Sequence, residues 1–194
     1  MSPSQEIPAL DALPEHCWRR LTRAVDDRSD PWRTPAVGTR SETGASLRTV
    51  VLRSVSSDLR ELLLHTDARS TKAGELDRTP WLSWLFWDPN DQEQLRCEGA
   101  VTLHREDALA ASQWRDLPAH SRANYRMPDT PGTPLDEATA RTPRMDDADS
   151  AFTRFLVVRC QVETLDWLLL DRRGHRRARM SWSAPRWHAD WVAP

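Results

Sequence analysis

The chain has 194 residues and a formal net charge of −2, so it is long enough to bury the core of one domain. The near-neutral charge disfavours a general polyanion-binding protein, which is usually strongly basic, and we expect no nucleic-acid partner. Three widely spaced cysteines disfavour a disulfide framework and a zinc site, so no bound metal is expected. The sequence shows no leader pattern and no stretch of membrane-spanning length, which predicts a cytoplasmic protein without membrane attachment.

The beginning of the chain predicts a disordered tail followed by a helix. Residues 1–12 contain little that could be buried. Between residues 13 and 30, the apolar side chains Trp18, Leu21 and Val25 recur at spacings of three and four. We therefore expect an N-terminal helix over 13–30, at the start of a single domain that covers 13–194.

Most of the remaining chain predicts short strands joined by hairpins. Segments rich in β-formers and bounded by turn residues are found at 36–40, 45–55, 59–66, 81–88, 92–105, 152–170, 175–182 and 187–192. A short helix is expected before Pro80 and another over 106–116, while the proline-rich segment 127–150 predicts a mobile loop. Gly99 interrupts an alternating segment and predicts a β-bulge. The expected fold class is mainly β, an antiparallel barrel with flanking helices.

The stretch around Lys72, the only lysine in the chain, predicts an anion site. An apolar run ends near His65, turn-forming residues follow, and a helix then begins close to Ser70 and Thr71. Free amide groups at a helix N-terminus, next to hydroxyls and the cations Arg69 and Lys72, suit a phosphate group. The alternative is an ordinary capped helix that follows a solvated basic turn.

Two further cationic features leave alternatives open. Arg48 and Arg53 lie an odd number of residues apart, so a regular strand would direct them to opposite faces, and at least one would face a pocket, a partner subunit or water. The segment 174–179 is the densest cationic stretch and fits a solvated hairpin edge, a nucleic-acid contact or a bound anion. No GxGxxG, P-loop, GxSxG or HExxH motif is present.

Several motifs in order resemble the FMN-binding motifs of the pyridoxamine 5′-phosphate oxidase family. They are Arg-Thr-Val-Val-Leu-Arg at 48–53, His-Thr at 65–66, Arg-Ser-Thr-Lys at 69–72, Gln-Leu-Arg-Cys-Glu-Gly at 94–99 and the ending Trp-His-Ala-Asp-Trp-Val-Ala-Pro. The resemblance covers roughly 35–194 and is greatest to the cyanobacterial and plant-type subgroup of FMN-binding pyridoxamine-phosphate-oxidase-like domains. It implies a split β-barrel homodimer with FMN between the subunits.

The resemblance also implies roles for individual residues. Those expected to contact FMN are Arg48, Thr49, Val50, Val51, Leu52, Arg53, His65, Thr66, Ser70, Thr71, Lys72, Gln94 and Arg177. Arg48 and Lys72 would hold the phosphate. Arg53, Ser121 and His175 would bind a small phosphorylated substrate, and Arg53, His175 and Arg177 would take part in catalysis.

The implied activity is hydride transfer from pyridoxamine or pyridoxine 5′-phosphate to FMN, with reoxidation by oxygen and pyridoxal 5′-phosphate as product. The chain departs from the family on the substrate side: Arg53 replaces a lysine, Leu117 an arginine and Leu168 a tryptophan. A split-barrel flavin reductase with another substrate and a nicotinamide or deazaflavin donor is one alternative. A non-catalytic FMN-binding protein or an arginine-rich interaction module is another.

Overall fold

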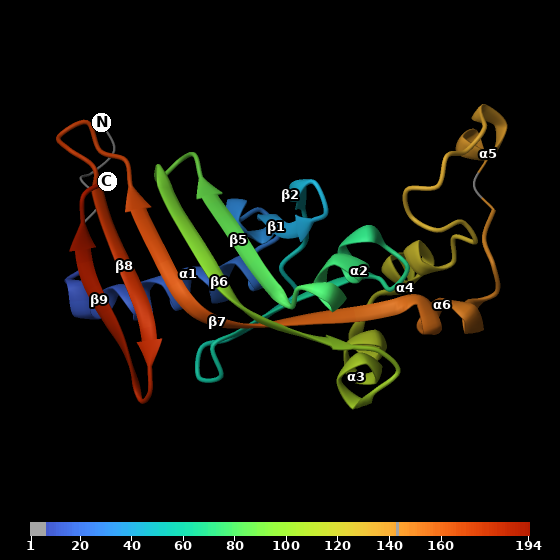
Figure 1. The fold of residues 1–194 in the computed structure, drawn as a ribbon, viewed down its shortest axis with the longest axis horizontal. Helices are drawn as coiled ribbons and strands as arrows, with labels where there is room; N and C mark the ends of the chain where they lie inside the picture. Colours follow the sequence, from blue (N-terminus) through green and yellow to red (C-terminus); the bar gives the residue numbers. More distant parts are fainter. Residues whose placement is uncertain (1–6, 143) are drawn as a thin grey trace.

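The computed structural model describes residues 7–142 and 144–194, and nine strands in this part of the chain form one antiparallel sheet (Figure 1). The strands are β1 (Ala36–Ser41), β2 (Gly44–Thr49), β3 (Ser54–Ser56), β4 (Glu61–Asp67), β5 (Trp81–Asp88), β6 (Glu93–His104), β7 (Phe155–Leu169), β8 (Arg176–Ser183) and β9 (Arg186–Val192). Their order is β2-β1-β5-β6-β7-β4-β3, and the β8–β9 hairpin pairs with β7. The predicted antiparallel architecture is confirmed.

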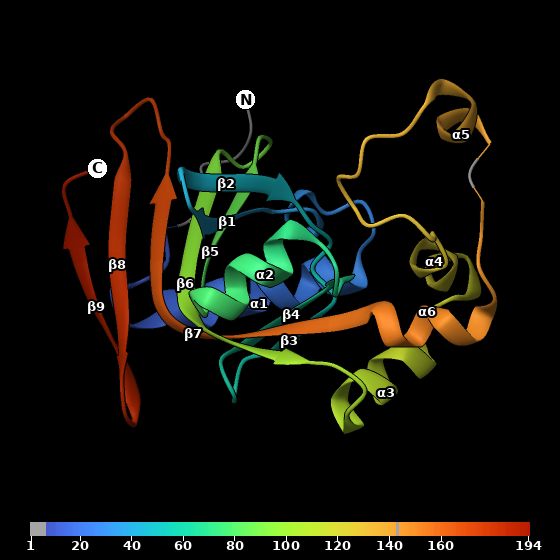
Figure 2. The same cartoon turned by 45° about the vertical axis from the view of Figure 1, so that its right-hand side comes forward.

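The 15-residue strand β7 connects the two ends of the molecule. Its first half pairs with β4, from Phe155 opposite Asp67 to Gln161 opposite Glu61. Its last six residues, which begin at Thr164, pair with β8. The β8–β9 hairpin therefore lies at one end of β7 and β4 at the other, as Figures 1 and 2 show.

The hydrogen-bonded ladder does not close into a complete barrel, but residues 50–53 connect its two edges. This segment joins β2, the first strand in the sheet order, to β3, the last. The amides of Val50 and Leu52 donate to the carbonyls of Pro35 and Arg33 at 3.0 and 2.9 Å, and the Arg53 amide donates to Leu63 at 2.9 Å. The strand expected over 45–55 is thus wrong at residues 50–53, which form a seam between the two edges rather than a ladder strand.

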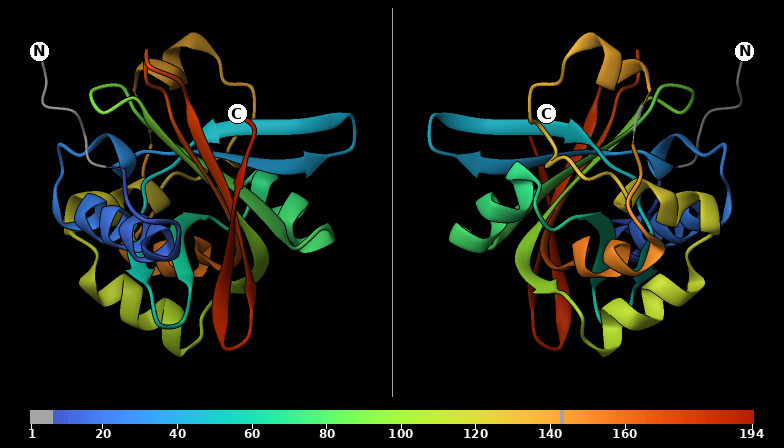
Figure 3. Two further views of the ribbon diagram at one scale, coloured as in Figure 1. Left: turned by 90° about the vertical axis from the view of Figure 1, so that its left-hand side faces the viewer. Right: turned by 90° about the vertical axis from the view of Figure 1, so that its right-hand side faces the viewer.

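Helices cover the sheet at both ends, and β1 and β2 form a hairpin that projects from it (Figure 3). They are α1 (Leu13–Asp26), α2 (Thr71–Arg78), α3 (Ala108–Asp116), α4 (Ala119–Arg122), α5 (Glu137–Arg141) and α6 (Ala148–Arg154), with 3₁₀ turns η1 (Leu10–Ala12), η2 (Pro31–Arg33) and η3 (Ala123–Tyr125). In the described residues no helix is both long enough and apolar enough to span a membrane.

Helix α1 packs its apolar face on the sheet because its apolar side chains share one side. Cys17 and Leu21 are fully buried, and Pro14 occupies a first-turn position that needs no amide donor. The helix ends at Asp26, four residues before the predicted end, and the next residue is already extended.

A buried polar network ties α1 to the end of β5 and the start of β6. Glu93 is fully buried, accepts a hydrogen bond from Trp167 Nε1 at 2.6 Å and lies 2.7 Å from His16 Nε2. Arg20 donates to Asp88 at 2.7 Å. Burial opposes ionisation of Glu93, but the bonds from His16 and Trp167 outweigh it and lower its pKa. The network therefore keeps an ionised carboxylate inside the core.

The predicted bulge at Gly99 is confirmed, because the β6–β7 register shifts between Glu98 and Gly99. A Cβ at residue 99 would lie 1.9 Å from the carbonyl oxygen of Gln161. Glycine is needed here because the neighbouring strand backbone approaches too closely for any side chain.

Three segments differ from their predicted structure. Residues 1–6 lie outside the described part, whereas Ile7 and Leu10 pack against the core and residues 10–12 form η1. The segment 127–150 contains α5 and the start of α6, and its mobility stays a prediction. The strand expected from 152 begins only at Phe155, because residues 148–154 form α6.

Candidate functional site

A cationic cluster lies where β2 passes the N-terminal end of α2. Lys72 Nζ donates to Thr66 Oγ1 at 2.6 Å, and Thr66 Oγ1 lies 3.2 Å from Ser70 Oγ. Burial lowers the pKa of Lys72, and the nearby Arg48 lowers it further. No carboxylate within the described residues forms a salt bridge with Lys72, so its positive charge is available to an anion from outside.

Helix α2 adds backbone donors to this cluster. It runs for eight residues from Thr71, and Ser70 at its N-cap forms no side-chain hydrogen bond to the helix. The amides of Thr71 and Lys72 have no backbone partner among the described residues and remain available, and the helix dipole adds positive potential. Thr71 is exposed beside them. An ammonium group, hydroxyls and free amides together fit a phosphate monoester, the group by which FMN would be held.

Arg48 joins the cluster but already has an internal carboxylate partner. Its Nη2 atom lies 3.0 Å from Glu75 Oε2, and Thr39 Oγ1 donates to the same oxygen at 2.5 Å. The Glu75 side chain is 3% exposed and that of Arg48 is 21% exposed. Arg48 also donates to Ser46 and to Thr39. The guanidinium is thus fixed in position before any ligand binds.

A second polar group forms around Arg53, on the other side of the seam. Arg53 is half-buried, and burial lowers its pKa. His65 lies near enough for Arg53 to lower its pKa, and its Nε2 is 3.0 Å from Gln113 Oε1. The phenol of the buried Tyr125 faces the same surroundings. The structure thus brings the predicted residues Arg53 and His65 together.

The segment between the two cations offers few free groups. Leu52 is fully buried, so its side chain packs in the core and lines no cleft. Thr49 is exposed and pairs with Ala36, while the amides of Val50 and Leu52 are bonded within the chain. The Val51 amide has no backbone partner among the described residues and could contact a ligand.

Gln94 and Arg177 lie in one row across the sheet, at the far end of β7. Gln94 is opposite Leu168, and Leu168 is opposite Arg177, so all three share a face. Arg177 donates twice to Asp166, at 2.9 and 2.8 Å. His175 is exposed in the turn before β8. Within one chain, Gln94, Arg177 and His175 thus form a group that is separate from the cluster around Lys72.

The two groups are separated by most of the length of β7. His65 pairs with Val157 and Gln94 pairs with Leu168, which are eleven positions apart on that strand. At roughly 3.3 Å per residue, this separation is about 36 Å. Ser121 lies on α4, half-buried and four residues before Tyr125, on the same side as Arg53.

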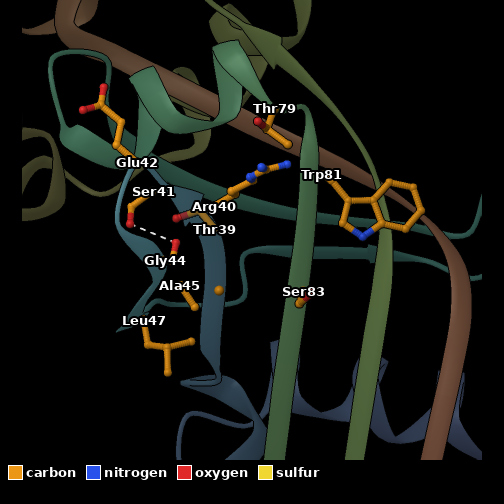
Figure 4. A pocket seen from close by; sticks show the side chains of 11 residues that line it. Thr39, Arg40, Ser41, Glu42, Gly44, Ala45, Leu47, Thr79, Trp81 and Ser83 are labelled. Atoms are coloured by element: carbon orange, nitrogen blue, oxygen red, sulfur yellow. Dashed lines mark hydrogen bonds between the residues drawn. The ribbon is translucent and has the colours of Figure 1, made fainter.

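An apolar surface on the outer face of the sheet lies between these groups. Leu47 is 74% exposed, and Trp81, Leu85 and Trp87 on β5 are 40, 40 and 37% exposed. A cavity of about 640 Å³ opens where the β1–β2 hairpin meets β5, with Leu47 and Trp81 in its lining (Figure 4). Four large exposed apolar side chains lie on this face, and such a patch is typical of an interaction surface.

The open antiparallel split barrel is the fold of the FMN-binding split-barrel proteins, and the cation cluster around Lys72 suits a phosphate group. Residues 15–105 match the family model described as "Pyridoxamine 5′-phosphate oxidase, FMN-binding domain". The resemblance predicted from the motifs is confirmed by this match, which covers slightly less than half of the chain. The prediction of FMN as cofactor is confirmed as well, because the matching family domain binds FMN.

Solved structures agree with this fold. A pyridoxamine 5′-phosphate oxidase-related, FMN-binding protein from Nostoc punctiforme is 23% identical with a TM-score of 0.76, covering 98% of this chain and 100% of that chain. PhzG from Burkholderia lata 383, solved in complex with tetrahydrophenazine-1-carboxylic acid, is 20% identical with a TM-score of 0.76, covering 100% of this chain and 98% of that one. At these identities the likeness shows a shared fold. A search of curated proteins gave no match.

Sequence reasoning missed the residues that hold the predicted ones in place. The sequence does not single out Glu75, because its buried contact with Arg48 is long-range. The same holds for Gln113 and Asp166, the partners of His65 and Arg177. The one available signal for Glu75 is a carboxylate in a short helix beside predicted cations, with which it can pair.

Proposed function

We propose that this protein is an FMN-dependent oxidoreductase of the pyridoxamine 5′-phosphate oxidase type that acts on a small anionic substrate. The observation that carries the proposal is the pair of cation sites on either side of the seam: Lys72 with Arg48 on one side, and Arg53 on the other. Two anions could be bound in line, the phosphate of the cofactor and an acidic group of the substrate.

The chain's own residues would hold the cofactor by its phosphate. Lys72 supplies an unpaired ammonium, Arg48 a fixed guanidinium, and Ser70 and Thr71 hydroxyls beside the free amides of α2. When bound, FMN would accept a hydride from a substrate carbon and pass two electrons to oxygen, which leaves as hydrogen peroxide. The proposed part of the protein is positioning and charge compensation.

We infer a homodimer from the same geometry. Gln94, His175 and Arg177 would contact the same flavin as Lys72 only if they came from a second copy, because about 36 Å of β7 separates the two groups within one chain. The apolar outer face with Leu47 and Leu85 supplies a surface for that copy. His175 and Arg177 would then reach the substrate side of the partner's cleft.

Pyridoxamine and pyridoxine 5′-phosphate are the first substrates to test. Oxygen-dependent formation of pyridoxal 5′-phosphate and peroxide by the yellow protein would identify the family reaction. Bleaching of the flavin by a nicotinamide or deazaflavin donor, without that turnover, would identify a reductase. A flavin that no donor reduces would indicate a binding protein without catalysis.

The cofactor site is tested by comparing FMN with riboflavin, which lacks the phosphate. We expect purified protein to bind FMN, and Lys72→Ala combined with Arg48→Ala to lose FMN while its weak riboflavin binding stays unchanged. Arg141→Gln, on an exposed helix, serves as a control for loss of a surface cation and should keep both affinities. A protein that stays colourless after incubation with FMN would refute the proposed function.

A further inference from the structure

The Arg53 guanidinium is an unpaired cation in a half-buried position. Among the described residues it forms no hydrogen bond and no salt bridge, whereas Arg20, Arg48 and Arg177 each face a carboxylate. A partly desolvated cation without a partner is unfavourable in the free protein. This arrangement indicates that an anion from outside completes the site.

The side chains of His65, Gln113 and Tyr125 near Arg53 are neutral at physiological pH. Burial lowers the pKa of His65 to about 4, so its imidazole is uncharged, and its Nε2 is 3.0 Å from the neutral Gln113 side chain. Burial raises the pKa of Tyr125 to about 12, so it is a phenol. Arg33, the other cation near Arg53, donates to carbonyl groups at the C-terminal end of α1.

Among the described residues near Arg53, no second cation lacks a hydrogen-bond partner, because Arg33 is held by backbone carbonyls. Leu117 is 5% exposed and belongs to the same buried apolar cluster as Tyr125 and Phe155. Arg177, which the proposed dimer would bring to this cleft, already donates two hydrogen bonds to Asp166. Within the described part of the chain, Arg53 is therefore the one cation of the site whose side chain has no internal partner, and neutral hydrogen-bonding groups lie near it.

We propose that the substrate carries a carboxylate, bound by Arg53, in place of the phosphate expected from the family. The planar guanidinium fork matches a carboxylate in shape, and one charge cancels one. A phosphate dianion would meet only one guanidinium here that is free of internal hydrogen bonds, in a partly desolvated site. The cofactor side differs, since Lys72, Arg48 and the α2 N-terminus all meet there. This inference rests on the proposed function and assigns the substrate class of that site.

The test compares two probes that share one aromatic ring: benzoate, with a carboxylate, and phenyl phosphate, a dianion at mildly alkaline pH. Each is titrated calorimetrically into the FMN-loaded protein and into Arg53→Gln and Arg53→Lys. We expect benzoate to bind about tenfold tighter than phenyl phosphate. Arg53→Gln should weaken benzoate roughly 10- to 100-fold and Arg53→Lys less, with FMN kept at a saturating concentration in each titration. Arg141→Gln, exposed on α5, should leave all values unchanged.

Each outcome decides the inference separately from the proposed function. Tighter binding of phenyl phosphate, no binding of benzoate, or benzoate binding that survives Arg53→Gln would overturn it while FMN binding stands. If FMN fails to bind, the proposed function is lost, and the same titrations of the FMN-free protein still measure whether Arg53 prefers the carboxylate.

Discussion

Replacing Glu75 with glutamine tests how Arg48 is shared between the protein and a bound phosphate. The buried carboxylate lies 3.0 Å from Arg48 Nη2 and accepts from Thr39 at 2.5 Å. Glutamine has the same size and still accepts from Thr39, but it removes the negative charge. Arg48 and the neighbouring Lys72 would then carry two uncompensated positive charges in the FMN-free protein.

The size of the effect follows from this pair. A hydrogen bond between charged groups contributes about 1.5–3 kcal/mol, so Glu75→Gln should lower the free energy of unfolding of the FMN-free protein by about 2 kcal/mol. FMN supplies a new anionic partner for Arg48 and regains part of this loss, whereas riboflavin regains none. If about 1.4 kcal/mol is regained, the ratio of the riboflavin Kd to the FMN Kd rises about tenfold.

Two measurements check this prediction: quenching of flavin fluorescence for both ligands, and chemical denaturation of the FMN-free protein. Glu42→Gln is the matched control, because Glu42 is 86% exposed and lies 4.0 Å from Arg78, so neither quantity should change. A Kd ratio that falls in Glu75→Gln would refute the reasoning. It would mean that the carboxylate is needed to orient Arg48 toward the phosphate and that charge sharing is secondary.

Three further predictions concern assembly and stability. Leu85→Glu on the exposed sheet face should turn the proposed dimer into a monomer that retains less FMN, while Leu59→Glu in the β3–β4 turn should leave the dimer unchanged. Light scattering after size exclusion measures the mass of both variants, and an unchanged dimer in Leu85→Glu would contradict the assigned face. Burial raises the pKa of Glu93, but its hydrogen bonds lower it by more, so the pKa in the folded protein lies below 4.5. The ionised carboxylate therefore contributes its full stabilisation above about pH 4.5, and this contribution is lost as the pH falls through the lower pKa of the folded protein. Acid unfolding followed by tryptophan fluorescence should therefore begin below about pH 4.5, and an onset near neutral pH would exclude this cause. Gly99→Ala should lower the free energy of unfolding by more than about 2 kcal/mol, because its Cβ meets the Gln161 carbonyl; a thermal melt like that of the parent protein would contradict the close approach.

Elements whose structure depends on nearby residues in the sequence could be predicted from local patterns. The run Trp81–Asp88 has tryptophans at a helix-like spacing, yet its flanking prolines and β-formers predicted a strand, and it is β5. Gly99 marked the bulge for a similar reason, because a glycine within an alternating strand signals a close backbone contact. The order of motifs from Arg48 to Gln94 was enough to indicate the family and FMN.

Features that depend on distant contacts could not be predicted in this way. Arg48 and Glu75 are 27 residues apart, and their pairing follows from how α2 packs against the β1–β2 hairpin. The break after Thr49 arises because residues 50–53 must pass from one edge of the sheet to the other, which strand propensity does not encode. Helix α6 was not predicted, because the prolines and acidic residues that precede it are typical of a loop.

The seam formed by residues 50–53 also sets a fixed spacing between two ligands. Arg48 is held by the hairpin and α2 at one edge of the sheet, and the Arg53 amide is bonded to Leu63 at the other. Adding or removing one residue here would move Arg53 relative to Arg48. Four residues separate the two arginines. The length of this connection would therefore determine which substrates fit, according to the distance between their acidic group and the flavin. Relatives with a longer or shorter seam would be expected to handle substrates of different length.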